Sequence, residues 1–176
     1  FNEPLLKKDI YRDIKAARKY LPNARIEIVT NGDVLRPDRL RKLFDAGLTT
    51  LLVSVYDGKK EEDHFHKMCE DLKLDKSSYI IRNRYMSEEF DHGLTLVNRV
   101  DIFKNREENK TKKTIKKKCT YPSYMFFIDY NGDVLMCSHD WGKRMVLGNV
   151  KKESFLKIWT TQRAMLNRKN LNAANR

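Results

Sequence analysis

The chain has 176 residues, 40% of them hydrophobic, with 36 lysines and arginines against 24 aspartates and glutamates. This composition permits a packed core, and the low counts of glycine (7) and proline (4) exclude a fibrous or linker-dominated protein. No apolar run approaches the roughly 20 residues that span a bilayer, so we expect no membrane association through such a helix. The net charge of +12 favours anionic partners, although a solvated basic surface also explains it. Three cysteines without a secretory pattern predict a reducing, cytoplasmic compartment.

The first 86 residues alternate between helical and strand patterns. Helices are predicted over 5–21, 35–47 and 60–74, and strands over 24–32, 49–58 and 77–86. The apolar stripes of the three helices comprise Ile10, Ile14, Ala17 and Leu21, then Leu40, Leu43 and Phe44, then Phe65, Met68, Cys69 and Leu72. Such alternation predicts an α/β fold whose strands are parallel and joined by right-handed crossovers.

Polar residues gather where each predicted strand ends. They are Thr30, Asn31, Ser54, Asp57, Arg82, Asn83 and Arg84. Functional sites of parallel sheets lie at the carboxyl ends of the strands, which favours a site at this edge. Strand ends are also exposed and commonly polar in proteins without a site there.

Beyond residue 86 the pattern changes. Residues 87–93 are predicted as a loop, 97–103 as one more strand, and 106–118 as a lysine-rich linker that either contacts phosphates or is simply solvated. A hairpin is predicted over 123–137, because Asn-Gly is the strongest short-range hairpin signal. A helix is then predicted over 153–166, with Phe155, Ile158, Trp159 and Met165 on its apolar side.

Two of the three cysteines flank this hairpin. Pairing of its strands brings Cys119 and Cys137 towards each other, and two thiolates held in this way are half of a four-sulfur site for an iron–sulfur cluster or zinc. Two unrelated core cysteines are the alternative. His139 either adds to such a site or is an exposed loop histidine. Cys69 falls on the buried stripe of a helix, which predicts an inert thiol.

The pattern C-x12-G-x4-C, followed by HDW, LGNV and a helix containing IW, resembles the SPASM or twitch auxiliary domain of radical S-adenosylmethionine enzymes. The matching residues are Cys119, Pro122, Gly132, Val134, Cys137, Asp140, Leu147, Gly148, Asn149, Ser154, Ile158 and Trp159. In that family a further cysteine group follows the last helix. The resemblance implies that Cys119 and Cys137 are metal ligands.

The first half of the chain resembles the same family independently. FNEPLL is similar to the family's "GEP" segment, apart from Asn2 in place of the first glycine, and this implies that Glu3 binds the amino group of S-adenosyl-L-methionine. TNG and SVYDG resemble the ends of the third and fourth barrel strands, which implies cofactor-binding roles for Asn31 and Ser54. An arginine near the end of the fifth strand meets the cofactor carboxylate in relatives. Arg82 is our choice, and Arg84 on the same face is the alternative.

The resemblance implies a partial (β/α) barrel of the radical-SAM type over residues 1–105, a basic linker over 106–118, and a small hairpin-plus-helix auxiliary domain over 119–176. The family's CxxxCxxC motif and its later auxiliary cysteines do not occur in these residues. The chain also begins without methionine, so we expect a longer natural protein in which both ends of the fold are completed.

The implied function is that of a radical S-adenosylmethionine oxidoreductase. Its cofactors would be S-adenosyl-L-methionine and [4Fe-4S] clusters, and a 5′-deoxyadenosyl radical would abstract hydrogen from a peptide or small-metabolite substrate. An auxiliary cluster and a reducing electron donor would assist. The alternatives are a non-enzymatic basic α/β protein that binds RNA or an acidic peptide, and a zinc-stabilised module.

Overall fold

The computed structural model describes residues 3–85, 117–140 and 142–174. The chain divides into two compact units, residues 2–95 and 96–176, which are described separately below. The predicted loop at 87–93, the predicted strand at 97–103 and most of the linker at 106–118 lie outside the described residues. Among the helices that the structure describes, none has the length and apolar character needed to cross a membrane.

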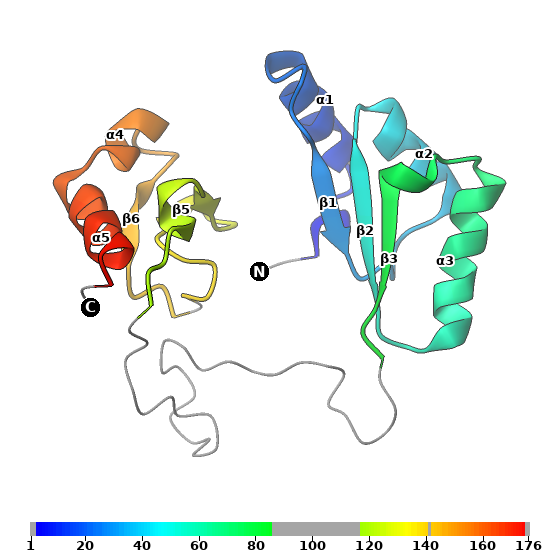
Figure 1. Ribbon diagram of the computed structural model, residues 1–176. Coiled ribbons are helices and arrows are strands. Elements are labelled where there is room, and N and C mark those ends of the chain that lie inside the picture. Colours follow the sequence, from blue (N-terminus) through cyan, green and yellow to red (C-terminus); the bar gives the residue numbers. More distant parts are fainter. Residues whose placement is uncertain (1–2, 86–116, 141, 175–176) are drawn as a thin grey trace. The chain divides into compact units, whose positions relative to one another are not determined.

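The N-terminal unit alternates helices and strands, as predicted (Figure 1). Its elements are η1 (Pro4–Leu6), α1 (Ile10–Tyr20), β1 (Glu27–Thr30), α2 (Pro37–Asp45), β2 (Thr50–Val55), α3 (Lys59–Asp71), η2 (Lys76–Ser78) and β3 (Tyr79–Asn83). The strands form one sheet in the order β1-β2-β3, and both neighbouring pairs are parallel. The α/β prediction and the parallel pairing are confirmed.

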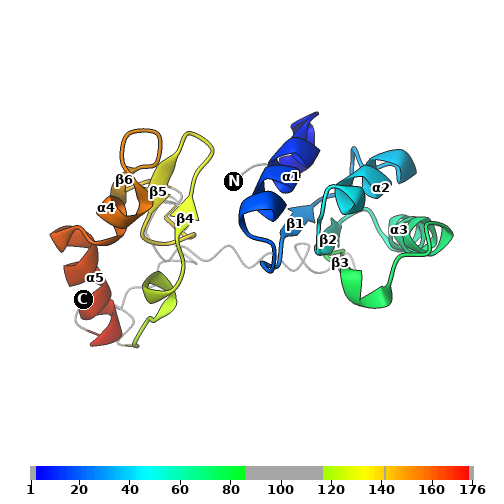
Figure 2. The same cartoon turned by 90° about the horizontal axis from the view of Figure 1, so that it is seen from above.

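Helices α1, α2 and α3 lie on one side of this sheet (Figure 2). Strand β2 is buried along its whole length, and Leu51, Val53 and Val55 point from it into the core against the helices. On the opposite face Val29 is 51% exposed and Ile80 is 43% exposed. This face is exposed along β1 and β3, whereas Leu52 of the central strand is only 5% exposed on it; we refer to it as the open face because α1, α2 and α3 all lie on the other side of the sheet.

The first helix differs from its prediction over 5–21. A short 3-10 turn, η1, comes first, and α1 begins only at Ile10 and ends at Tyr20. The segment is interrupted because Glu3 caps η1 and the backbone of Lys7 is extended. Leu21, which we expected on the buried stripe, is 58% exposed beyond the helix end.

The C-terminal unit is an antiparallel sheet with two short helices. Its elements are η4 (Tyr121–Ser123), β4 (Phe127–Ile128), β5 (Asp133–Leu135), β6 (Val146–Asn149), α4 (Phe155–Trp159) and α5 (Gln162–Asn172). The strands pair antiparallel in the order β4-β5-β6, and the predicted hairpin around Asn131 and Gly132 is confirmed.

The single helix predicted over 153–166 is wrong, because α4 ends at Trp159 and α5 begins at Gln162. The hydroxyl of Thr160 donates to the carbonyl of Leu156 at 2.7 Å, and Thr161 is extended, with its hydroxyl capping α5. Side-chain hydroxyls of this kind compete with helix continuation and favour caps. As a result, the expected apolar residues Phe155 and Met165 are 48% and 51% exposed.

Candidate active site and cluster ligands

Glu3 binds the carboxyl end of β1. Its Oε1 accepts hydrogen bonds from the hydroxyl of Thr30 at 2.7 Å and from the backbone N–H of Leu5 at 2.9 Å. Its Oε2 accepts the backbone N–H of Asn31 at 2.9 Å. The carboxylate therefore joins the N-terminal segment to the strand end at which parallel sheets carry their sites.

The turn after β1 is built tightly around Gly32. Its φ is +85°, which favours glycine, and a Cβ there would lie 2.3 Å from Cζ of Phe65. The N–H of Gly32 donates to the hydroxyl of Thr30 at 3.0 Å. The amide of Asn31 is occupied locally, because its Nδ2 donates to Asp33 at 2.7 Å. Asn31 thus offers its backbone N–H, rather than its side chain, to Glu3.

Ser54 and Arg82 are direct neighbours across β2 and β3. The sheet register pairs Thr30 with Val53, so Asn31, one residue further on, is level with Ser54 and Arg82. Ser54 is 8% exposed, Arg82 is exposed, and both alternate with the core-facing residues of their strands, which places them on the open face. The sequence-predicted positions thus reach the same edge of the sheet, and the cavity that we expect between them stays a prediction.

Arg84 is the alternative to Arg82. Its backbone N–H donates to the carbonyl of Val55 at 2.7 Å, which extends the contact of β3 with β2 past the last strand residue. Arg84 is half-buried, whereas Arg82 is exposed beside Ser54. The register therefore favours Arg82 as the partner of a ligand that also contacts Ser54.

Glu61 shapes the turn at the carboxyl end of β2, and the sequence reasoning missed this contact. Its Oε2 accepts the backbone N–H groups of Tyr56 at 3.2 Å and Asp57 at 3.0 Å, and so holds the turn that follows β2. Glu61 is the third residue of α3, where acidic side chains reach back to the N–H groups that precede a helix. A glutamate at the third position of a predicted helix is the sequence signal that would have identified this contact.

Cys137 lies in a loop that is shaped around its sulfur. The backbone N–H of His139 donates to Sγ of Cys137 at 3.4 Å, and Nδ1 of the half-buried imidazole lies 3.8 Å from the same sulfur. The buried carboxylate of Asp140 accepts the N–H groups of Arg144 at 2.9 Å and Met145 at 2.7 Å, which closes the loop. An N–H group aimed at sulfur suits a thiolate, so this loop fits a metal-bound Cys137.

Cys119 lies beside the end of the last helix. Its backbone N–H donates to the carbonyl of Leu171 at 3.0 Å, and the amide of Asn172 donates to the hydroxyl of Ser123 at 2.9 Å. Cys119 and Cys137 are half-buried free thiols. No group of three or more potential metal ligands occurs among the described residues. The convergence of the two sulfurs on one cluster stays a prediction.

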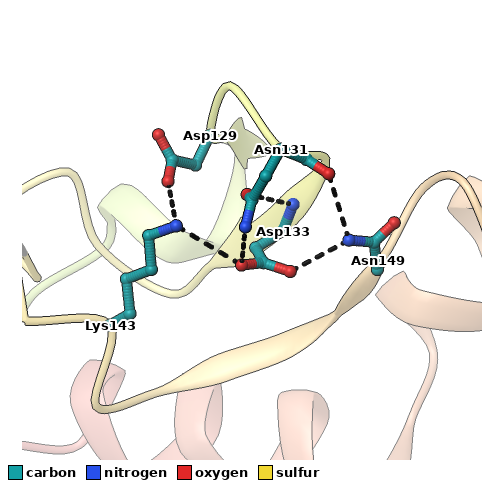
Figure 3. A network of polar contacts seen from close by, with 5 residues as sticks. All are labelled: Asp129, Asn131, Asp133, Lys143 and Asn149. Carbon is teal, nitrogen blue, oxygen red and sulfur yellow. Dashed lines mark hydrogen bonds and ion pairs between the residues drawn. The ribbon is translucent and has the colours of Figure 1, made fainter.

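A polar network holds the hairpin turn and the loop after Cys137 together (Figure 3). The carboxylate of Asp133 accepts hydrogen bonds from Asn131 at 2.6 Å and Asn149 at 2.9 Å, and lies 3.4 Å from Nζ of Lys143. Lys143 also pairs with the buried Asp129. The hydrogen bond from Lys143 lowers the pKa of Asp129, and hydrogen bonds from Asn149 and Asn131 lower the pKa of Asp133.

The remaining residues of the auxiliary-domain pattern serve packing and capping. A Cβ on Gly148 would lie 2.9 Å from Cγ1 of the fully buried Ile158. The hydroxyl of Ser154 caps α4 by accepting the N–H of Lys157 at 3.3 Å. Trp159 stacks on Phe155 with ring centroids 5.7 Å apart. These residues build the small domain that carries Cys137.

Cys69 is only 1% exposed on α3, as predicted. Burial raises the pKa of its thiol to about 11. A thiol of this kind is protonated at neutral pH and is therefore a poor nucleophile and a poor metal ligand.

Comparison with known families assigns both units. Residues 1–116 match the model of the radical SAM superfamily, and residues 119–175 match the SPASM iron–sulfur cluster-binding domain. The first match covers more than half of the chain, so the chain belongs to the radical SAM superfamily. The partial (β/α) barrel with an auxiliary domain is confirmed, and the cofactors of this family are S-adenosyl-L-methionine and [4Fe-4S] clusters.

One curated relative is the S-adenosyl-L-methionine-dependent 2-deoxy-scyllo-inosamine dehydrogenase of Niallia circulans, which is 29% identical over 178 residues and is matched along the whole of this chain. The crystal structure of BtrN in complex with AdoMet and 2-DOIA is 27% identical, with a TM-score of 0.74 over 98% of this chain. BtrN in an open conformation shares the fold, with 23% identity and a TM-score of 0.69 over the whole chain. The chain spans 63 to 66% of the length of the sequence and the two crystal structures that it matches.

Proposed function

We propose that the full-length protein is a radical S-adenosylmethionine dehydrogenase that oxidises a small polar metabolite. The family assignment and the named activity of the Niallia circulans relative support this proposal. When bound, S-adenosyl-L-methionine with its [4Fe-4S] cluster supplies the hydrogen-abstracting 5′-deoxyadenosyl radical, and an auxiliary cluster supplies a second redox centre. The remaining contributions come from side chains of this chain, which bind and orient these groups.

The observation that carries the proposal is that Asn31, Ser54 and Arg82 lie next to one another at the ends of three parallel strands. Glu3 is hydrogen-bonded to the end of the first of these strands. The methionyl part of the cofactor carries an ammonium and a carboxylate. The Glu3 carboxylate suits the ammonium, and the exposed guanidinium of Arg82 suits the carboxylate. Ser54, which is 8% exposed beside Arg82, is the residue that we assign to the ribose or methionyl part.

In the C-terminal unit, Cys119 and Cys137 supply two of the four thiolates that a [4Fe-4S] cluster takes. The N–H of His139 stabilises the negative charge on the Cys137 sulfur. The carbonyl of Leu171 orients the backbone of Cys119 and brings the end of α5 beside this ligand. Ligands that follow α5 would therefore start next to the cluster.

A small cyclic amino-polyol is the substrate class that we favour over a peptide, because the relative is named a dehydrogenase of 2-deoxy-scyllo-inosamine and the BtrN structure holds 2-DOIA. The cytoplasm is the compartment that we propose, since the clusters and the three free thiols need reducing conditions. A one-electron donor is required to start each turnover. No contact among the described residues favours RNA or an acidic peptide as the ligand.

The test is anaerobic reconstitution of the full-length protein with iron and sulfide, followed by reduction in the presence of S-adenosyl-L-methionine. We expect iron for two [4Fe-4S] clusters and formation of 5′-deoxyadenosine, accelerated by cyclic amino-polyols. Absence of 5′-deoxyadenosine from protein that holds its full iron content would overturn the proposal. Acceleration by peptides alone would overturn the substrate class only.

A further inference from the structure

We infer that Thr30 is a positioning residue for the cofactor's amino group, because it fixes the rotation of the Glu3 carboxylate. This inference rests on the proposed function, since it assumes that Glu3 binds the ammonium of S-adenosyl-L-methionine. The two side chains come from segments 27 residues apart and meet through one hydrogen bond of 2.7 Å.

The direction of that hydrogen bond is set by the neighbouring backbone. The N–H of Gly32 donates to Oγ1 of Thr30 at 3.0 Å, so this oxygen already acts as an acceptor. Because Thr30 is only 2% exposed, its hydroxyl proton is shielded from solvent and is donated to Oε1 of Glu3. The threonine therefore acts as a fixed donor to one oxygen of the carboxylate.

The hydrogen bonds are divided unequally between the two oxygens of Glu3. Oε1 accepts two donors, the hydroxyl of Thr30 and the N–H of Leu5, whereas Oε2 accepts one, the N–H of Asn31. Each carboxylate oxygen accommodates about two donors. The structure thus assigns the remaining acceptor position to Oε2 and directs an incoming ammonium to that oxygen.

Pre-orientation of this kind favours binding, because the carboxylate does not have to be ordered when the ligand arrives. Without the Thr30 hydroxyl, one backbone N–H remains on each oxygen, that of Leu5 on Oε1 and that of Asn31 on Oε2, so the carboxylate is held less firmly in the orientation that the ammonium needs. The ligand must then supply the free energy that orders the carboxylate, and we expect binding to weaken by roughly 10-fold, which corresponds to about 1.4 kcal/mol.

The experiment compares Thr30→Val with Thr30→Ser in the reconstituted full-length protein and measures the affinity for S-adenosyl-L-methionine by calorimetry. Valine keeps the shape but removes the hydroxyl, whereas serine keeps the hydroxyl. We expect roughly 10-fold weaker binding for Thr30→Val and nearly unchanged binding for Thr30→Ser. Equal affinities of Thr30→Val and wild type would overturn the inference. If Thr30→Val does not fold, Thr30→Cys replaces it, with the same expected weakening.

Combination with Glu3→Ala separates positioning from general destabilisation. If Thr30 acts through Glu3, the double variant Glu3→Ala/Thr30→Val binds no more weakly than Glu3→Ala alone. Additive losses would mean that Thr30 supports the fold and does not position Glu3, which overturns the inference. Unchanged affinity of Glu3→Ala itself would instead remove Glu3 from the site and overturn the cofactor-binding part of the proposed function.

Discussion

Gly148 and Ile158 are so close that a methyl group on the glycine would lie 2.9 Å from Cγ1 of the isoleucine and 3.3 Å from its Cδ1. Strand β6 can approach α4 in this way only where no side chain intervenes. Ile158 is fully buried, so it cannot move aside into solvent. The glycine of the LGN pattern is therefore a packing requirement of the domain that carries Cys137.

We expect Gly148→Ala to lower the free energy of unfolding of the C-terminal unit by about 1–3 kcal/mol, the usual cost of overpacking a core. Urea unfolding followed by the fluorescence of Trp159, in a Trp141→Phe background, measures this change. Ile158→Ala removes the two isoleucine atoms and leaves only the contact of 3.1 Å with Oε1 of Glu153, so Gly148→Ala should cost much less in that background. Additive losses in the double variant would show that the contact with Ile158 is not the cause.

Cys119→Ala and Cys137→Ala should each lower the iron content of the full-length protein by about one cluster, because a missing thiolate leaves the auxiliary cluster incomplete. Iron and sulfide analysis of anaerobically purified protein measures this loss. Cys69→Ala is the matched control, since its buried thiol has a pKa of about 11 and should carry no iron. Wild-type iron in the double cysteine variant would make both residues ordinary core residues.

Arg82→Ala should weaken the binding of S-adenosyl-L-methionine by at least about 10-fold, because the cofactor's carboxylate loses a charge-assisted hydrogen bond. Arg84→Ala, one residue beyond the end of β3, is the matched control and should change the affinity much less. Calorimetry on the reconstituted protein distinguishes the two variants. If Arg84→Ala weakened binding more than Arg82→Ala, then Arg84 would be the residue that binds the cofactor's carboxylate.

The C-terminal unit should lose stability in acid. In the folded state the pKa of Asp129 is lowered, first by the hydrogen bond from Lys143, and that of Asp133 is lowered, first by the hydrogen bond from Asn149. A lowered carboxyl pKa contributes stability that is complete above the unfolded value of about 4 and is lost as the pH falls through the folded value. We therefore expect the urea concentration at which half of this unit is unfolded to decrease once the pH is lowered below about 4.

Asp129→Asn tests this assignment, because it removes one of the two titrating groups and keeps the size of the side chain. The variant should be less stable than wild type at pH 7, since Lys143 loses its buried partner. Its midpoint should also change less between pH 6 and pH 3. Parallel pH profiles of the variant and the wild type would argue against Asp129 as a source of the acid sensitivity.

Sequence reasoning found the elements of both units because their signals are local. The apolar stripe of α3, the parallel α/β alternation and the Asn131–Gly132 turn depend on spacings of a few residues, and the structure confirms them. The helix predicted over 153–166 failed for a similarly local reason. Thr160 and Thr161 divide α4 from α5 by bonding to backbone groups, and that signal was outweighed by the apolar spacing around it.

Contacts between distant segments were decided only by the tertiary structure. A pattern can mark Glu3 as a ligand residue, but its hydrogen bond to Thr30 depends on how the N-terminal segment crosses the end of β1. The position of Arg82 directly beside Ser54 likewise depends on the register of β3 against β2, which no local spacing specifies. The sequence by itself thus determined which residue types stand at the strand ends. Packing and strand register determined which of these residues lie next to one another, because both depend on how the whole sheet is buried.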